Sequence, residues 1–281
     1  MKIVILGSQG QVGGELCPAL AHLGEVVAFD RRGCDLASPG RAAAVIAEHR
    51  PAVVVNAAAY TKVDKAEQEP DLARRINADA VAEIAASVRA LGAFLVHYST
   101  DYVFDGNQRE PYREDDRTAP LGVYGRTKLA GEEAVTTSGC RNVVFRTSWV
   151  HAARGANFIR TILRLAAERD TVRVVDDQFG APTGAPLIAA VTARAIERFG
   201  AGSAATPGLV HLAAAGAASW CDVAREALAE AARRGARLRV SAESVVPIGS
   251  ADYPTAARRP ANSRLDTERL RTVLGLALPP W

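Results

Sequence analysis

Short apolar runs alternate with longer alanine-rich stretches along the first half of the chain. The runs cover residues 3–6, 25–29, 52–55, 94–97 and 142–145. The stretches between them have helical period, and this alternation is typical of βαβ units around a parallel sheet. We therefore predict an α/β fold, in which a Rossmann-like, doubly wound parallel sheet is followed by a smaller C-terminal lobe.

Helices are expected over 11–23 and 70–91. Ser38 and Pro39 read as an N-cap followed by proline at the first helical position, which predicts a helix that reaches Arg50. Further elements are expected beyond residue 149, as helices over 157–168, 185–199 and 220–233 and as strands over 172–175 and 209–212.

A glycine-rich turn, Gly7-Ser8-Gln9-Gly10-Gln11-Val12-Gly13, connects the first predicted strand to the first helix. Glycine lets the backbone approach a pyrophosphate, and the helix N-terminus offers unpaired N–H groups and a partial positive charge. The GxxGxxG spacing is the variant found in short-chain dehydrogenases. We predict that a dinucleotide binds here, through Gly7, Gly10, Gln11, Val12 and Gly13.

The end of the second strand predicts the adenosine side of that site. Asp30 is placed to accept hydrogen bonds from a ribose, which favours NADH. Arg31 and Arg32 follow at once and are able to pair with a 2′-phosphate, which favours NADPH. We predict NADPH or NADH as the cofactor, with Asp35 and Leu36 beside the adenine. Residues 1–150 are then an NAD(P)-binding Rossmann domain, and residues 151–281 a substrate-binding lobe interleaved with the sheet.

Tyr124 and Lys128 are four residues apart and lie on one face of a predicted helix. An ammonium beside a phenol favours the phenolate and lowers the phenol pKa, which suits proton transfer to a carbonyl near neutral pH. We predict that Tyr124 donates a proton to a ketone oxygen as hydride reaches the carbon. Lys128 holds the tyrosine pKa down and bonds the nicotinamide ribose, and Thr100 polarises the same oxygen.

The composition argues against several other classes of protein. Lys and Arg number 34 against 31 Asp and Glu, and this net charge of +3 is dispersed, so we expect no nucleic-acid partner. The cysteines Cys17, Cys34, Cys140 and Cys221 are far apart, which predicts reduced thiols and no metal site. The apolar run at the N-terminus is too short for a signal peptide, and no run has the length of a membrane span. We expect a cytoplasmic protein that does not bind membranes.

Six motifs carry a resemblance to a known family: NAAAYTKVD (56–64), STDYVFDG (99–106), YGRTKLAGE (124–132), RTSWV (146–150), DQFGAPT (177–183) and RPANS (259–263). Together they resemble the dTDP-4-dehydrorhamnose reductase family of extended short-chain dehydrogenases/reductases. The similarity extends over nearly the whole chain. The second and fifth motifs distinguish this family from the epimerases and dehydratases that share its cofactor fold.

The resemblance implies that the C4 ketone of dTDP-4-dehydro-β-L-rhamnose is reduced to dTDP-L-rhamnose, a cell-envelope precursor, with NADPH or NADH as the hydride donor. By position it implies further residues beside the cofactor: Ala57, Ala58, Ala59, Tyr60 and Ser99. It also implies residues that line the substrate pocket. Those for the sugar are Thr61, Val63, Tyr102 and Trp149, and those toward the nucleotide diphosphate are Asn157 and Phe158.

Some relatives in this family pair through a magnesium site built from glutamates. Glu15 is present here, but Pro186 stands where the family can carry a glutamate, so we expect a monomer or weak homodimer without bridging magnesium. Two other functions fit the same residues: a reductase of a different dTDP-4-keto-6-deoxy sugar, and a non-catalytic nucleotide-binding regulatory subunit such as the partner of methionine adenosyltransferase.

Overall fold

A computed structural model describes residues 1–200, 203 and 205–281. Its centre is a six-stranded sheet with the order β10-β5-β4-β3-β1-β2, in which all neighbours are parallel. The strands are β1 (Lys2–Leu6), β2 (Glu25–Phe29), β3 (Val53–Asn56), β4 (Phe94–Thr100), β5 (Arg141–Thr147) and β10 (Gly208–His211). Because helices cover both faces of a parallel sheet, the predicted doubly wound α/β fold is confirmed.

The two faces of the sheet have separate cores. Ile3 and Ile5 point toward one face, where they pack with side chains of α1 (Gln11–Leu20), α8 (Ala185–Phe199) and α10 (Glu268–Leu274). Val4 and Leu6 point toward the other face, where α2 (Arg41–His49), α5 (Ala80–Leu91) and α6 (Val123–Thr137) lie. Strands buried on both sides need apolar residues at every position, which is why they appear as uninterrupted apolar runs in the sequence.

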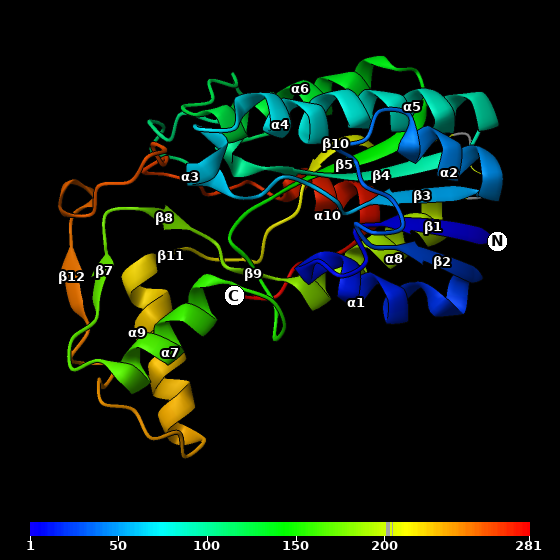
Figure 1. Ribbon diagram of the computed structural model, residues 1–281. Helices are drawn as coiled ribbons and strands as arrows, with labels where there is room; N and C mark the ends of the chain where they lie inside the picture. The colour runs from blue at the N-terminus through cyan, green and yellow to red at the C-terminus, as the bar shows by residue number, and fades with distance from the viewer. Residues whose placement is uncertain (201–202, 204) are drawn as a thin grey trace.

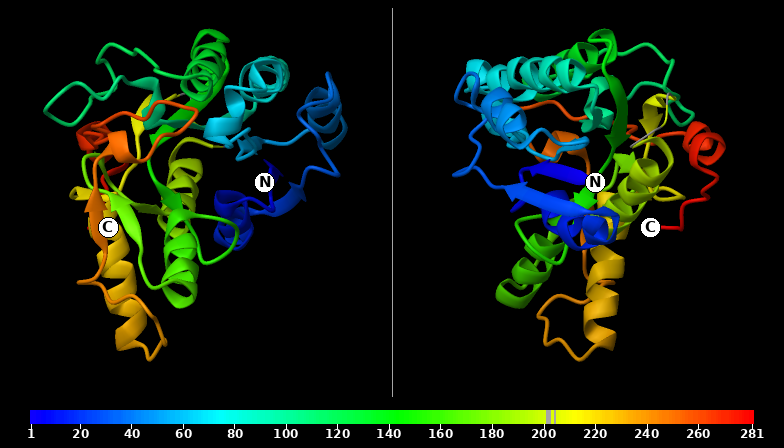
Figure 2. Two further views of the ribbon diagram at one scale, coloured as in Figure 1. Left: turned by 60° about the vertical axis from the view of Figure 1, so that its left-hand side comes forward. Right: turned by 90° about the vertical axis from the view of Figure 1, so that its right-hand side faces the viewer.

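The second half of the chain contributes both to the sheet and to a separate lobe. Strand β10 and helices α8 and α10 join the sheet, whereas α7 (Phe158–Glu168) and α9 (Trp220–Arg233) pack on each other at one side of it (Figures 1 and 2). The strand pair β7 (Arg173–Val175) and β12 (Val246–Ile248) completes this lobe. Two short pairs join the parts: β6 (Val150–His151) with β9 (Thr183–Gly184), and β8 (Phe179–Gly180) with β11 (Ala218–Ser219).

The predicted N-cap at Ser38 is wrong. Helix α2 begins at Arg41, after Gly40 in the left-handed conformation with φ 73°. The Ser38 N–H bonds the Asp35 carbonyl at 3.0 Å, and the Ser38 carbonyl accepts from Arg41 N–H at 3.3 Å. Ser38 and Pro39 therefore form a turn ahead of the helix, and the glycine allows the chain to change direction there.

The helix predicted over 70–91 is interrupted. It consists of α4 (Pro70–Arg74), a π-helical turn (Arg75–Asp79) and α5. The π turn contains Asn77, whose side chain bonds the Tyr60 N–H at 2.8 Å and the Tyr60 carbonyl at 3.1 Å. One short helix, α3 (Val63–Ala66), precedes it, and 3-10 turns cover Ala21–Leu23, Asp101–Val103 and Ser250–Asp252. π-Helical turns such as Arg75–Asp79 often occur at functional sites.

Candidate active site

The loops that follow β1, β3 and β4 meet at the carboxyl edge of the sheet. Strand β1 lies between β2 and β3, which is the point where the strand order reverses and where ligands bind in open α/β sheets. A cleft of about 1120 Å³ opens there, lined on its far side by lobe residues such as Asn157 and Trp220. Single drug-sized ligands occupy pockets of about 300–1,000 Å³, so this cleft has room for more than one small molecule.

The glycine turn lies at one end of the cleft. Gly7 has φ 85°, and a Cβ there would lie 2.6 Å from the Ala58 nitrogen. A Cβ on Gly13 would lie 2.1 Å from the Gly7 carbonyl oxygen, so this glycine allows α1 to pack against the turn. Gly7, Gly10, Gln11 and Val12 line the cleft, whereas Gly13 is buried and does not line it. Because Gly10 caps α1 without a side chain, the first N–H groups of the helix remain available, and the turn fits a pyrophosphate.

The predicted adenosine residues are only partly brought together. Asp30, Arg31 and Leu36 line the cleft, whereas Arg32 and Asp35 do not. The Asp30 carboxylate accepts from the Gln9 amide at 2.9 Å and from the Gly33 N–H at 2.9 Å. Gln9 lines the cleft as well, although the spacing of the glycines gave no reason to single it out.

Thr100, Tyr124 and Lys128 line the middle of the cleft, together with Ser99. Thr100 ends β4, and the other two lie one helical turn apart on α6. Lys128 is 3% exposed and donates from Nζ to the Tyr98 carbonyl at 2.6 Å. Burial lowers the pKa of Lys128 to about 8.

The predicted effect of Lys128 on Tyr124 is wrong in this structure. Burial and then the charge of Asp101 raise the pKa of the Tyr124 phenol to about 12, while the nearby Thr100 hydroxyl opposes the rise. The Lys128 ammonium is itself buried and donates to a backbone carbonyl, so desolvation decides the direction in which the pKa of the phenol shifts. Tyr124 is therefore held in its protonated form, as a proton donor requires.

The predicted substrate residues also line the cleft: Thr61, Val63, Tyr102, Trp149, Asn157 and Phe158. Trp149 stacks on Trp220 with ring centroids 3.6 Å apart and has a left-handed φ of 47°. Phe158 packs against Trp220, with ring centroids 4.5 Å apart. Trp220 was missed by the sequence analysis, although an aromatic residue at the first position of a predicted helix was a usable signal.

Asn157 joins the lobe to the glycine turn. Its side chain caps α7 by accepting from the Arg160 N–H at 3.0 Å, and its amide donates to the Gln11 side chain at 2.9 Å. The remaining cofactor-side residues, Ala57, Ala58, Ala59 and Tyr60, follow β3 and also line the cleft. The lobe and the glycine turn therefore hold each other in place.

Two further observations concern metals, thiols and membranes. All four cysteines are free, as predicted, and within residues 1–200, 203 and 205–281 no three His, Cys, Asp or Glu side chains are grouped as a metal site would require. Over the same residues, no helix has both the length and the apolarity to cross a membrane.

The fold and the arrangement of Thr100, Tyr124 and Lys128 define the class: short-chain dehydrogenases/reductases, which are nicotinamide-dependent oxidoreductases. The model of the family described as "RmlD substrate binding domain" matches residues 1–281. Together with the relatives below, this match shows that the chain belongs to the dTDP-4-dehydrorhamnose reductase family.

Curated relatives named dTDP-4-dehydrorhamnose reductase match the whole chain. Those of Shigella flexneri and Escherichia coli K12 are each 48% identical over 285 residues, covering 100% of this chain and 94% of the relative. Among solved structures, the Bacillus anthracis reductase in complex with NADP is 33% identical, with a TM-score of 0.91. The match covers 100% of this chain and 95% of that one. The Clostridium acetobutylicum protein has 34% identity and a TM-score of 0.90.

Proposed function

We propose that the chain reduces the C4 ketone of dTDP-4-dehydro-β-L-rhamnose to dTDP-L-rhamnose, using NADPH or NADH. The observation that carries this proposal is the set of Thr100, Tyr124 and Lys128, which lines the cleft together with the glycine turn and residues of the lobe. Identity of 48% over the full length to curated reductases of this substrate supports the choice of sugar nucleotide.

In this mechanism a bound reduced nicotinamide supplies hydride to the ketone carbon. Tyr124 donates its proton to the ketone oxygen, and its high pKa ensures that the proton is present at neutral pH. Lys128, on the next turn of α6, would bond the nicotinamide ribose. Bound ligands would exclude water from these groups.

We assign the rest of the cleft according to the neighbours of each residue. Gly7, Gly10, Gln11 and Val12 would hold the pyrophosphate, with Asp30 and Arg31 at the ribose. Thr61, Val63, Tyr102 and Trp149 would contact the sugar, and Asn157 and Phe158 the nucleotide diphosphate. The boundary near residue 150 between a cofactor domain and a substrate lobe is part of this proposal, and the return of β10 to the sheet supports an interleaved arrangement.

We also propose a cytoplasmic monomer or weak homodimer. Glu15 forms an ion pair with Arg154 at 3.2 Å, so its carboxylate is already engaged. Pro186 is the second residue of α8 and has no ligand atom to offer a metal. Sedimentation velocity with and without magnesium tests this proposal, and a metal-dependent dimer would contradict it.

Purified protein should oxidise NADPH or NADH only when dTDP-4-dehydrorhamnose is present, and mass spectrometry with NMR should identify dTDP-L-rhamnose. A panel of other dTDP-4-keto-6-deoxy sugars provides the comparison, because one or two pocket side chains can change the preferred sugar. Faster turnover of another sugar would overturn the substrate assignment. Tight cofactor binding without turnover of any sugar would favour a regulatory subunit.

A further inference from the structure

Thr100 has a single hydroxyl proton, and in this structure it is already donated. Thr100 Oγ1 donates to Asp101 Oδ1 at 2.9 Å and accepts from the Tyr102 N–H at 3.2 Å. A hydroxyl carries one donor and two acceptor sites, so Thr100 cannot polarise a ketone oxygen while this bond persists. The role predicted for Thr100 therefore requires a change at Asp101.

The surroundings of Asp101 favour protonation of its carboxylate. It is 2% exposed, and among residues 1–200, 203 and 205–281 its Oδ2 has no partner that meets hydrogen-bond geometry. A buried carboxylate with an unpaired oxygen is costly when ionised, and protonation of the carboxyl group removes that cost. Burial raises the pKa of Asp101 to about 6, while the nearby Ser263 and Thr100 hydroxyls oppose the rise.

Ser263 comes from the far end of the chain. It is 3% exposed, and its N–H bonds the Phe179 carbonyl at 2.7 Å. The segment before it packs tightly on the turn after Asp101, where Asn262 N–H bonds the Gly106 carbonyl at 3.2 Å. The C-terminal segment thus closes the pocket around the carboxyl group.

We propose, resting on the reductase function above, that Asp101 is a positioning residue that sets where the Thr100 hydroxyl donates. When the carboxylate is ionised, Thr100 donates to Asp101. When Asp101 carries its proton on Oδ1, the carboxyl group donates to Thr100 Oγ1 and no longer accepts from it. The Thr100 hydroxyl then donates to the substrate ketone, and Tyr124 and Thr100 act on the same oxygen. The protonated Asp101 is the productive form.

Other titratable groups face the same region and must be separated from Asp101. The charge of Asp101 reaches Tyr102 in its own turn and Tyr124 on α6, and burial with that charge raises the pKa of both phenols. Arg259 acts on Tyr102 from the C-terminal segment, and Lys128 has a pKa of about 8. Burial lowers the pKa of His97 and of His151 below the usual histidine value. A transition near pH 6 is therefore assigned to Asp101, and one near 8 to Lys128.

The test measures single-turnover hydride transfer between pH 5 and 9 with prebound NADPH and the keto sugar. Wild-type protein should be about 100-fold to 1,000-fold faster below the Asp101 transition than above it, which is the effect of gaining one hydrogen-bond donor at the oxygen. Asp101→Asn is neutral at every pH and has an amide that donates to Thr100, so its rate should lose that transition and keep the one near 8. Asp105→Asn is the matched control, because Asp105 lies outside the cleft lining, and it should retain both transitions.

Ser263→Ala removes a hydroxyl that lowers the Asp101 pKa, so the first transition should move to higher pH. It also serves as a second variant if Asp101→Asn folds poorly. An Asp101→Asn protein that keeps the wild-type transition, or a Ser263→Ala protein with no shift, would overturn the proposal.

A measurement without substrate separates this proposal from the reductase assignment. Infrared difference spectra of the protein between pH 5 and 8 should contain a protonated-carboxyl band that is missing in Asp101→Asn. Absence of the band would refute the role of Asp101 whatever the protein reduces. Presence of the band with no turnover of any keto sugar would refute only the reductase assignment.

Discussion

Two buried polar clusters hold α6 against the sheet, and they are built in opposite ways. The catalytic cluster is Thr100, Asp101, Tyr124 and Lys128. The anchor cluster is Glu114, Glu132, Arg146 and His211. Apart from the partly buried Tyr124, the side chains of both clusters are nearly inaccessible to water, yet only the anchor cluster pairs its charges.

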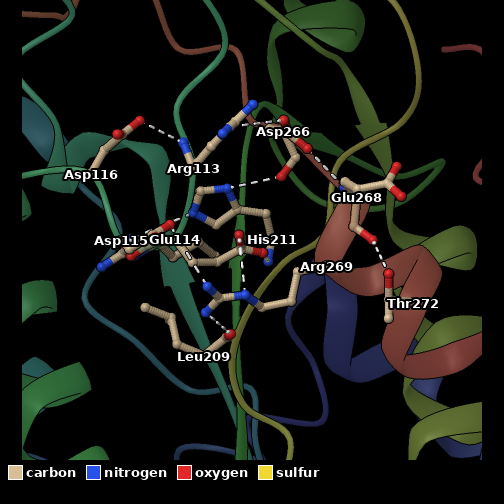
Figure 3. Close-up of polar contacts among 11 residues, drawn as sticks. Arg113, Glu114, Asp115, Asp116, Leu209, His211, Asp266, Glu268, Arg269 and Thr272 are labelled. Atoms are coloured by element: carbon tan, nitrogen blue, oxygen red, sulfur yellow. Dashed lines mark hydrogen bonds and ion pairs between the residues drawn. The ribbon is translucent and has the colours of Figure 1, made fainter.

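In the anchor cluster each charge has a partner. Arg146 donates through Nε to Glu132 at 3.0 Å, and through Nη2 to the same carboxylate. Glu114 accepts from the His211 N–H at 2.8 Å and lies 3.6 Å from Arg269 (Figure 3). Burial and the charge of Arg146 lower the pKa of His211 to about 3, so the ring is neutral and bonds the Asp266 carbonyl at 3.1 Å.

In the catalytic cluster burial shifts each pKa toward the neutral form. The pKa values of Asp101 and Tyr124 are raised, and the pKa of Lys128 is lowered. Such groups cost stability but hold protons that can be moved, which is the property that acid–base chemistry needs. Charges are therefore paired in the anchor cluster, which holds α6 against the sheet. They are left without a paired opposite charge in the catalytic cluster.

The largest effect is expected for Tyr124→Phe. Turnover should fall by about 10²- to 10⁴-fold, because the general acid is lost. The melting temperature should stay the same or rise, since a buried hydroxyl is removed. Tyr112→Phe, a buried tyrosine outside the cleft lining, is the control and should keep its turnover per folded molecule. Near-normal turnover in Tyr124→Phe would show that Tyr124 is not the general acid, and the catalytic cluster would lose the role assigned to it.

Arg146→Met should have the largest effect on stability. It leaves Glu132 buried without its partner, which costs about 3–5 kcal/mol in the free energy of unfolding. Adding Glu132→Gln should recover most of that loss. Urea denaturation measures both variants, and a loss below about 1 kcal/mol for Arg146→Met would mean that the anchor cluster does not fasten α6.

Lys128 gives the catalytic cluster a pH signature in stability. Its pKa is about 8 in the folded protein and 10.5 as the ordinary value, so the unfolded chain binds more protons between these limits. Stability should therefore rise as pH increases from 8 to 10.5, by on the order of 3 kcal/mol.

Lys128→Met should abolish this rise and be more stable than wild type at pH 7. Chemical denaturation at a series of pH values measures the difference. The same slope in both proteins would show that Lys128 is compensated after all, and the contrast with the anchor cluster would be lost.

The smallest effect is expected on the surface. Arg164 and Glu168 form an i, i+4 pair on α7 with side chains 58% and 56% exposed. Arg164→Ala should change the free energy of unfolding by less than about 0.5 kcal/mol. A larger change would indicate that exposure does not separate strong from weak ion pairs in this protein.

The sequence by itself determined the fold and predicted most of the residues that line the candidate site. Apolar runs that need two buried faces specify a parallel sheet, and its carboxyl ends bring Gly7, Thr100 and Ala57 to one edge whatever the loops do. The spacing of Tyr124 and Lys128 places them on one side of a helix. Local periodicity is sufficient for these conclusions because each depends on backbone geometry alone.

Only the tertiary structure decided the state of each group. The start of α2 depends on the φ of Gly40, and the π turn at Asn77 depends on its bonds to Tyr60. The pKa of Tyr124 is raised because burial outweighs the nearby ammonium, and Asp101 is enclosed by Ser263 from 162 residues along the chain. Desolvation and long-range contacts are properties of the folded volume, and spacing along a chain carries no information about either.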